Sequence, residues 1–94
     1  MEYEYIWDEK KRQSNMRKHR FDFKRAREVF NDPNGLVIYD GSHASEERFL
    51  FVGVLDTVLV TVVVFTETDY IAVRRIISFR KASKEEREQY HGRR

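Results

Sequence analysis

The chain has 94 residues, enough for one hydrophobic core, so we expect a single domain over residues 1–94. It contains no cysteine, which excludes disulfides, thiolate metal sites and cysteine nucleophiles and fits a cytoplasmic protein. The 18 Lys and Arg residues nearly balance the 16 Asp and Glu residues, but the basic ones gather in the first and last thirds. This distribution is typical of a solvated helix surface, or of a basic face that meets a phosphate backbone.

The sequence shows no sign of a secretory signal at its start or of a membrane helix in its most apolar stretch. The residues Met1–Trp7 are acidic, unlike the basic and then apolar start of a secretory signal. The most apolar stretch, Val58–Phe65, is far shorter than the roughly 20 residues that a membrane helix needs. We therefore expect a buried strand at this stretch and no association with a membrane.

The first third of the chain predicts a strand and two helices. Polar and apolar residues alternate over Tyr3–Trp7, which predicts a short strand. Asp8 is a suitable N-cap for a helix over 9–18. The only apolar side chain of that helix is Met16, so its ends need anchors, which we expect from Trp7, Phe21 and Phe23. A second helix is predicted over Phe23–Phe30.

The remaining two thirds predict a run of strands and a last helix. Asp56 and Thr57 are short enough for a hairpin turn, and Ser83 and Glu86 form a capping box before a helix over Lys84–Tyr90. The strands are expected at Leu36–Tyr39, Arg48–Leu55, Val58–Phe65 and Tyr70–Phe79. The order β-α-α-β-β-β-β-α predicts an α+β fold with an antiparallel sheet and helices packed on one side, which leaves the other face free.

The last predicted strand carries the candidate phosphate contacts. Strict alternation places Ser78 and Arg80 on one face and Arg75 on the other. A guanidinium is a rigid fork of donors that matches phosphate oxygens. Arg75 either serves this purpose or pairs with a carboxylate such as Glu67 or Glu47. For Arg80 and Lys81 phosphate is favoured, because they lie beside the N-terminus of the last helix.

Metal and cofactor motifs are missing from the sequence. There is no glycine-rich phosphate loop and no nucleophile elbow, and the three histidines are scattered at His19, His43 and His91. We therefore expect neither a metal ion nor a cofactor.

One pattern of residues runs in order along nearly the whole chain. It consists of Trp7-Asp8, Asn15, Lys18-His19, Phe23, Ala26, Val29-Phe30 and Asp32-Pro33, then of Asp40, His43 and Glu46-Glu47-Arg48-Phe49, and then of Arg75-Ile76-Ile77-Ser78 followed by Arg80-Lys81-Ala82. This pattern resembles that of the BrnT family of toxins. Two residues depart from the family pattern: Arg20 stands where a glycine is usual, and Phe79 stands where a small residue is usual. We expect Phe79 to face away from any substrate.

The resemblance implies a RelE-like fold and a toxin of a type II toxin–antitoxin system. Such a toxin cleaves RNA endonucleolytically, without a metal ion, when the RNA's own 2′-hydroxyl attacks the adjacent phosphate. The partner it implies is a BrnA-like ribbon-helix-helix antitoxin that binds operator DNA, in a complex with two or more copies of each chain. A non-catalytic module that binds a nucleic acid or a protein partner is the alternative.

For that reaction we assign candidate residues in two groups. His19 and Glu67 are candidates for proton transfer, although His19 also fits a cation at the end of a helix. Cationic side chains are expected to neutralise the negative charge that develops on the phosphate in the transition state. The catalytic set is Arg75, Arg80, Lys81, Glu67 and His19, and the substrate-binding set is Lys11, Asn15, Lys18, Arg48 and Ser78. Lys11, Asn15 and Lys18 share one helical face, which either holds RNA or is simply solvated.

Overall fold

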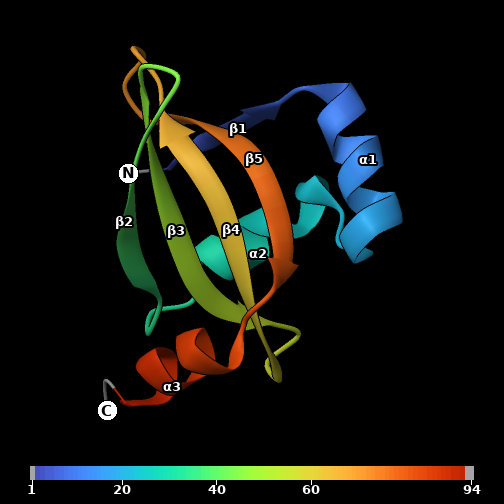
Figure 1. Ribbon diagram of the computed structural model, residues 1–94, viewed down its shortest axis with the longest axis vertical. Coiled ribbons are helices and arrows are strands. Elements are labelled where there is room, and N and C mark those ends of the chain that lie inside the picture. Colours follow the sequence, from blue (N-terminus) through green and yellow to red (C-terminus); the bar gives the residue numbers. More distant parts are fainter. Residues whose placement is uncertain (1, 93–94) are drawn as a thin grey trace.

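The computed structural model describes residues 2–92 and confirms the predicted order of elements (Figure 1). The predicted second helix begins with a turn of 3-10 helix, η1, before α2. The elements are β1 (Glu4–Trp7), α1 (Glu9–His19), η1 (Phe23–Arg25), α2 (Ala26–Phe30), β2 (Leu36–His43), β3 (Glu46–Leu55), β4 (Leu59–Glu67), β5 (Val73–Lys81) and α3 (Lys84–Gly92). Within residues 2–92, no helix is long and apolar enough to cross a membrane.

The strands form one five-stranded sheet in the order β1-β5-β4-β3-β2. The strands β2 to β5 are an antiparallel meander, as predicted. The first strand differs from the prediction, because β1 pairs with β5 in parallel and makes the sheet mixed. No hairpin links β1 to a neighbouring strand, since α1 and α2 separate it from the other strands. It can therefore run parallel to β5.

Two hairpins build the meander. Asp56 and Thr57 have φ of 55° and 63° and confirm the predicted hairpin turn, but the turn also includes Val58, because Leu55 pairs with Leu59 and β4 begins there. Ala44 and Ser45 have φ of 50° and 69° and make a two-residue turn between β2 and β3. Because this second turn is so tight, β2 and β3 extend to it and are longer than the sequence predicted.

A bulge in β5 changes the predicted faces of the sheet. Val64 lies opposite Ser78, but Phe65 lies opposite Ile76, so Ile77 is an extra residue in β5. Strict alternation is therefore wrong across this point. Ile76 and Phe79 lie on one face of the sheet, and Arg75 joins Ser78 and Arg80 on the other.

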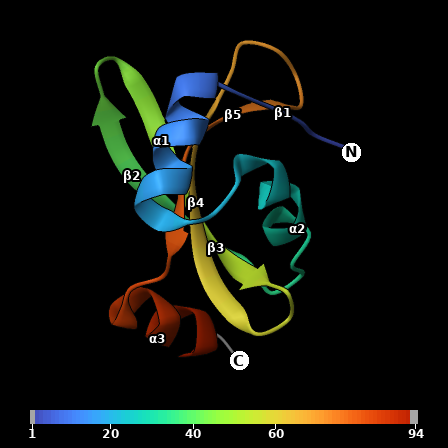
Figure 2. The ribbon, with the colours of Figure 1, turned by 90° about the vertical axis from the view of Figure 1, so that its right-hand side faces the viewer.

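Helices cover both faces, which corrects the prediction that they pack on one side (Figure 2). One face packs Phe51, Val63, Phe65 and Phe79 against η1 and α2. On the other face, Val52, Val60 and Val62 pack with Ala82 and Tyr90, so α3 crosses one end of that face. The reason is Tyr90, which packs on the valines and donates a hydrogen bond to Asp32 at 2.5 Å. No other helix formed by residues 2–92 packs on the rest of this second face.

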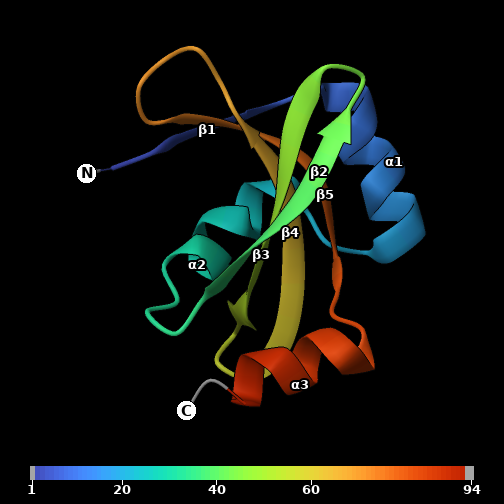
Figure 3. The same cartoon turned by 60° about the vertical axis from the view of Figure 1, so that its left-hand side comes forward.

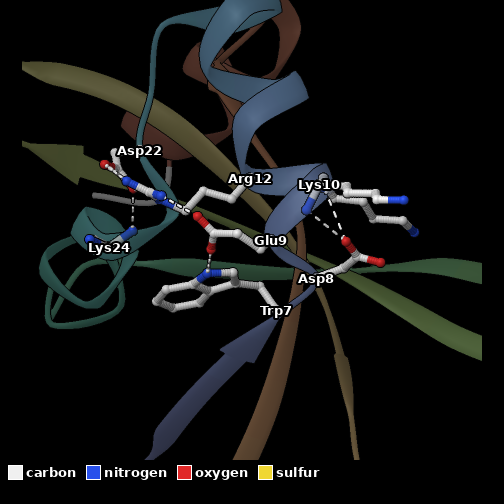
Figure 4. Close-up of polar contacts among 8 residues, drawn as sticks. Trp7, Asp8, Glu9, Lys10, Arg12, Asp22 and Lys24 are labelled. Carbon is white, nitrogen blue, oxygen red and sulfur yellow. Dashed lines mark hydrogen bonds and ion pairs between the residues drawn. The ribbon is translucent and has the colours of Figure 1, made fainter.

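The helix α1 stands beside β5 (Figure 1). The predicted anchors are confirmed, because Trp7 packs edge-on against Phe23 and Phe21 stacks on Phe79. At its start, Asp8 accepts hydrogen bonds from the amides of the first turn. Polar contacts add to these anchors: Arg12 bonds Asp22 at 2.8 and 2.9 Å and also pairs with Glu9, which accepts from Trp7 at 3.3 Å (Figure 4).

Candidate functional site

The second face of the sheet is the candidate site. We call it the open face, and it consists of Glu46, Arg48 and Leu50 of β3, Val64 and Thr66 of β4, and Arg75, Ser78 and Arg80 of β5. Leu50 and Val64 are only half-buried there, whereas Phe51 and Phe65 on the opposite face are buried. The open face therefore combines an apolar floor with three arginines.

Arg48 lies on the open face, and no ion pair engages it within residues 2–92. It stands two residues before Leu50 on β3, so it extends from the same face. Its Nε is shielded from solvent and makes no hydrogen bond within residues 2–92. A buried donor left unpaired costs about 1–3 kcal/mol. Because Arg48 as a whole is only half-buried and no ion pair engages it within residues 2–92, it is available to an anionic oxygen on the open face.

The other two arginines of the open face each hold a carboxylate. Arg75 pairs with Glu46 across β4, so its partner is neither Glu67 nor Glu47. Arg80 makes a two-pronged pair with Glu86 of α3, at 2.8 and 2.9 Å. The hydrogen bonds from Arg80 lower the pKa of Glu86 to about 2, against the opposing effect of burial. Both guanidinium groups are thus held in fixed positions by carboxylates.

The end of α1 borders the open face. Ser78 Oγ donates to Asn15 Oδ1 at 3.3 Å, and Asn15 itself is buried against β5. His19 ends α1 and is half-buried. Burial, followed by the charges of Lys18 and Arg80, lowers the pKa of His19 below its ordinary value of 6.5. His19 is therefore neutral at pH 7 and able to accept a proton.

The structure does not bring together all the residues that the sequence suggested. Glu67 lies on the face opposite Arg75 and bonds Arg74 at 2.8 Å. Lys81 lies opposite Thr61, on the face away from Arg80, and is exposed. The gathered residues are Arg48, Arg75, Ser78 and Arg80, with His19 and Lys18 at the border. Lys11 is exposed, one helical turn before Asn15.

Sequence reasoning missed Glu46 and Glu86, the carboxylates that hold two of the arginines. The capping box was a usable signal for Glu86, since it places that side chain beside the end of β5. No comparable signal existed for Glu46, because its contact with Arg75 spans 29 residues and a third strand. Among residues 2–92, no three side chains of His, Cys, Asp or Glu gather in a way that fits a metal ion.

Comparisons with known proteins point to one family. Residues 7–86 match the sequence profile described as "Ribonuclease toxin, BrnT, of type II toxin-antitoxin system". The crystal structure of the Brucella abortus ribonuclease toxin BrnT is similar to this chain at a TM-score of 0.69 and 30% identity, covering 87% of this chain and 99% of the Brucella chain. No curated protein matches the chain.

Proposed function

The chain belongs to the BrnT family of ribonuclease toxins of type II toxin–antitoxin systems, and on that basis we propose that it cleaves RNA internally, without a metal ion. In the proposed reaction the 2′-hydroxyl loses its proton to a base and attacks the adjacent phosphorus. The bond from phosphorus to the 5′-oxygen breaks, and that oxygen takes a proton from water. The products are a 2′,3′-cyclic phosphate and a 5′-hydroxyl.

Arg48 carries this proposal. A dianionic phosphorane needs donors that are already in place, since preorganised charge is usually the largest catalytic contribution. Arg75 and Arg80 are held by carboxylates, whereas the shielded Nε of Arg48 lacks any partner in residues 2–92. A phosphate oxygen on the open face would pair with this half-buried arginine, which no carboxylate engages within residues 2–92. We therefore assign the reacting phosphate to Arg48, with Arg75 and Arg80 on either side.

His19 is the proposed base. Its ring is neutral at pH 7, because burial and then the cations Lys18 and Arg80 lower its pKa. It ends α1 at the border of the open face, and Ser78 of that face donates to Asn15 of the same helix. A neutral imidazole beside a cationic surface is well suited to take the proton of a 2′-hydroxyl. Lys18 is available for the RNA backbone.

The test compares Arg48→Ala with Arg74→Ala on single-stranded RNA in buffer with EDTA. Arg74 is the matched control, because it is also a strand arginine but lies on the opposite face, with its guanidinium 3.8 Å from the centre of the Tyr3 ring. We expect cleavage by the unaltered chain to persist in EDTA. Arg48→Ala should lower kcat/KM by at least about 30-fold without loss of folding stability. Arg74→Ala should lower stability and leave kcat/KM unchanged.

Three results would contradict the proposal. Cleavage that EDTA abolishes and magnesium restores would show a metal-dependent reaction. Full activity of Arg48→Ala would show that the phosphate binds elsewhere. If the unaltered chain bound RNA in a salt-dependent way but never cleaved it, a non-catalytic module would be the correct assignment.

A type II toxin works with an antitoxin, and we propose a BrnA-like ribbon-helix-helix protein as the partner. Two copies of each chain would form the complex, which would bind operator DNA through the antitoxin. The open face and the border of α1 are basic surfaces, so an inhibitor with acidic groups fits them by charge.

A further inference from the structure

The loop between β4 and β5 presents two exposed apolar side chains. Tyr70 is 77% exposed and Ile71 is 85% exposed at its tip. The loop is tied down by Thr68, whose Oγ1 donates to Val73 O at 2.8 Å and accepts from the amide of Tyr70 at 3.2 Å. The amide of Glu4 in β1 also donates to Ala72 O at 2.8 Å. An exposed aromatic ring on a fixed backbone is a suitable surface for stacking.

A cleft of about 630 Å³ lies at this end of the sheet, with residues of the β4–β5 loop and of the β2–β3 turn in its walls. Figure 3 shows the loop and the turn at the same end of the sheet. Tyr70 and Asp69 come from the loop, and Ser45 from the turn. Ile6 and Phe49 add apolar surface, and the volume falls in the range of ordinary ligand sites.

The cleft continues from the open face, because Arg75 lines it as well. From Arg80 to Arg75 the strand covers roughly 15 Å at about 3.3 Å per residue, less at the bulge. A single strand of RNA whose phosphates lie along the arginines would therefore bring a neighbouring nucleotide to the cleft.

The charge of the cleft decides which part of a nucleotide it accepts. Of the residues 2–92, four carboxylates and one cation, Arg75, line the cleft. Three of them are engaged: Glu46 by Arg75, Glu67 by Arg74 and Glu47 by the hydroxyl of Tyr39. Asp69 has no hydrogen bond or ion pair within the described residues 2–92. A phosphate would be repelled here, whereas an uncharged base that presents N–H groups would be accepted.

We propose that this cleft binds a guanine base of the RNA substrate, which extends the ribonuclease function proposed above. Tyr70 stacks on the base, as aromatic side chains do with unpaired bases in single strands. Asp69 accepts from N1–H and from the N2 amino group, two neighbouring donors that match the two oxygens of one carboxylate. Guanine is the base whose pairing edge presents both of these donors side by side.

The experiment uses short single-stranded RNAs in which each guanine in turn is replaced by inosine, which lacks the N2 amino group. The full chain is compared with Tyr70→Ala, Tyr70→Phe and Asp69→Asn. Val58→Ala is the control, since Val58 is 82% exposed in the β3–β4 turn at the far end of the sheet. Tyr70→Ala should lower kcat/KM at least about fivefold through KM, and Tyr70→Phe should retain it. Asp69→Asn should remove the preference for guanine over inosine. Val58→Ala should behave as the unaltered chain.

The possible outcomes separate the two proposals. If the unaltered chain cleaves RNA and both Tyr70→Ala and Asp69→Asn keep its rate and base preference, the cleft does not bind a base, and the ribonuclease function still stands. If the unaltered chain cleaves none of these RNAs or longer ones, the ribonuclease function fails first. If Tyr70→Ala leaves cleavage unchanged but weakens binding of the antitoxin, the cleft contacts protein and the guanine site is wrong.

Discussion

The side-chain amide of Asn15 bonds both backbone groups of Phe79. Asn15 Oδ1 accepts from Phe79 N at 3.1 Å, and Asn15 Nδ2 donates to Phe79 O at 2.8 Å. The short strand β1 pairs only with residues 73–76 of β5. Beyond residue 76, the side-chain amide of Asn15 makes the hydrogen bonds to β5 that a neighbouring strand would otherwise make. This contact fixes α1, and with it His19, at the border of the open face.

Replacing Asn15 should destabilise the fold. In Asn15→Ala the buried amide and carbonyl of Phe79 lose their partner, and Phe21 O loses a donor at 2.9 Å. We expect a loss of about 2–4 kcal/mol in the free energy of unfolding, because each buried unpaired group costs about 1–3 kcal/mol. Urea denaturation measures this loss, with Gln13→Ala on the exposed side of α1 as the control. Equal stability of the two variants would show that water replaces the amide without cost.

The sequence predicts most elements but few of the contacts that shape the site. The N-cap at Asp8, the turn at Asp56 and the capping box at Ser83 are local signals, and all of them are confirmed. The bulge at Ile77 leaves no local signal, yet it alone decides that Arg75 shares a face with Arg80. The local sequence gives no indication that Asn15 is buried, because its partner Phe79 lies 64 residues away.

The helices show the same division between local and distant information. The pattern of α3 predicts a helix, but it does not tell which face of the sheet Tyr90 covers. Likewise, the parallel pairing of β1 depends on β5, which follows about 70 residues later in the chain. Phe79 is the exception: its size indicated that it faces away from substrate, and it is fully buried in the core on the opposite face.

Arg20 occupies a position that favours glycine. It is the C-cap of α1 with φ 70° and ψ 14°, a left-handed conformation that costs a residue other than glycine about 1–2 kcal/mol. Glycine would also gain freedom in the unfolded chain, which offsets part of this cost. Arg20→Gly should therefore stabilise the protein by about 0.5–1 kcal/mol in urea denaturation. Arg17→Gly, inside the same helix, should instead destabilise it by about 1 kcal/mol.

The pH dependence of cleavage should report on His19. Burial and the cations Lys18 and Arg80 lower the pKa of His19 below its ordinary value of 6.5. The cleavage rate should therefore begin to fall only when the pH is below 6.5. Lys18→Ala removes one of these cations and should move this acid limb to higher pH. Lys10→Ala, at the other end of α1, is the control and should leave the limb in place. If the acid limb of the pH profile stays in place in Lys18→Ala, His19 is not the base.

Glu86 should make stability depend on pH in acid. Its pKa is about 2 in the folded protein, against 4.5 ordinarily, because Arg80 and then Ser83 donate to it. A lowered pKa stabilises the fold above pH 4.5, and that contribution disappears as the pH falls toward 2. Glu86→Gln should therefore lose about 1–2 kcal/mol near pH 7, where partial exposure weakens the pair, and should match the unaltered chain near pH 2. A difference that persists at pH 2 would indicate lost packing and not a lost charge.

We expect the antitoxin to bind α1 and the open face. The helix α1 has no buried apolar side chain within Glu9–His19, so its exposed basic side is available to a partner, as is the open face. Association steered by charge should be fast and should slow as salt is added. Co-expression followed by sizing should give a complex with two copies of each chain.

Hydrogen exchange on that complex locates the contact. We expect protection to increase in residues 11–18 and 75–81, where the cations lie, relative to the free chain. The β3–β4 turn around Val58 is an internal reference and should exchange at the same rate in both states. Protection confined to β2 and to the acidic start of α3 would show that the antitoxin inhibits without covering the arginines. In that case Arg48→Ala would bind the antitoxin as tightly as the unaltered chain does, and cleavage and neutralisation would use separate surfaces.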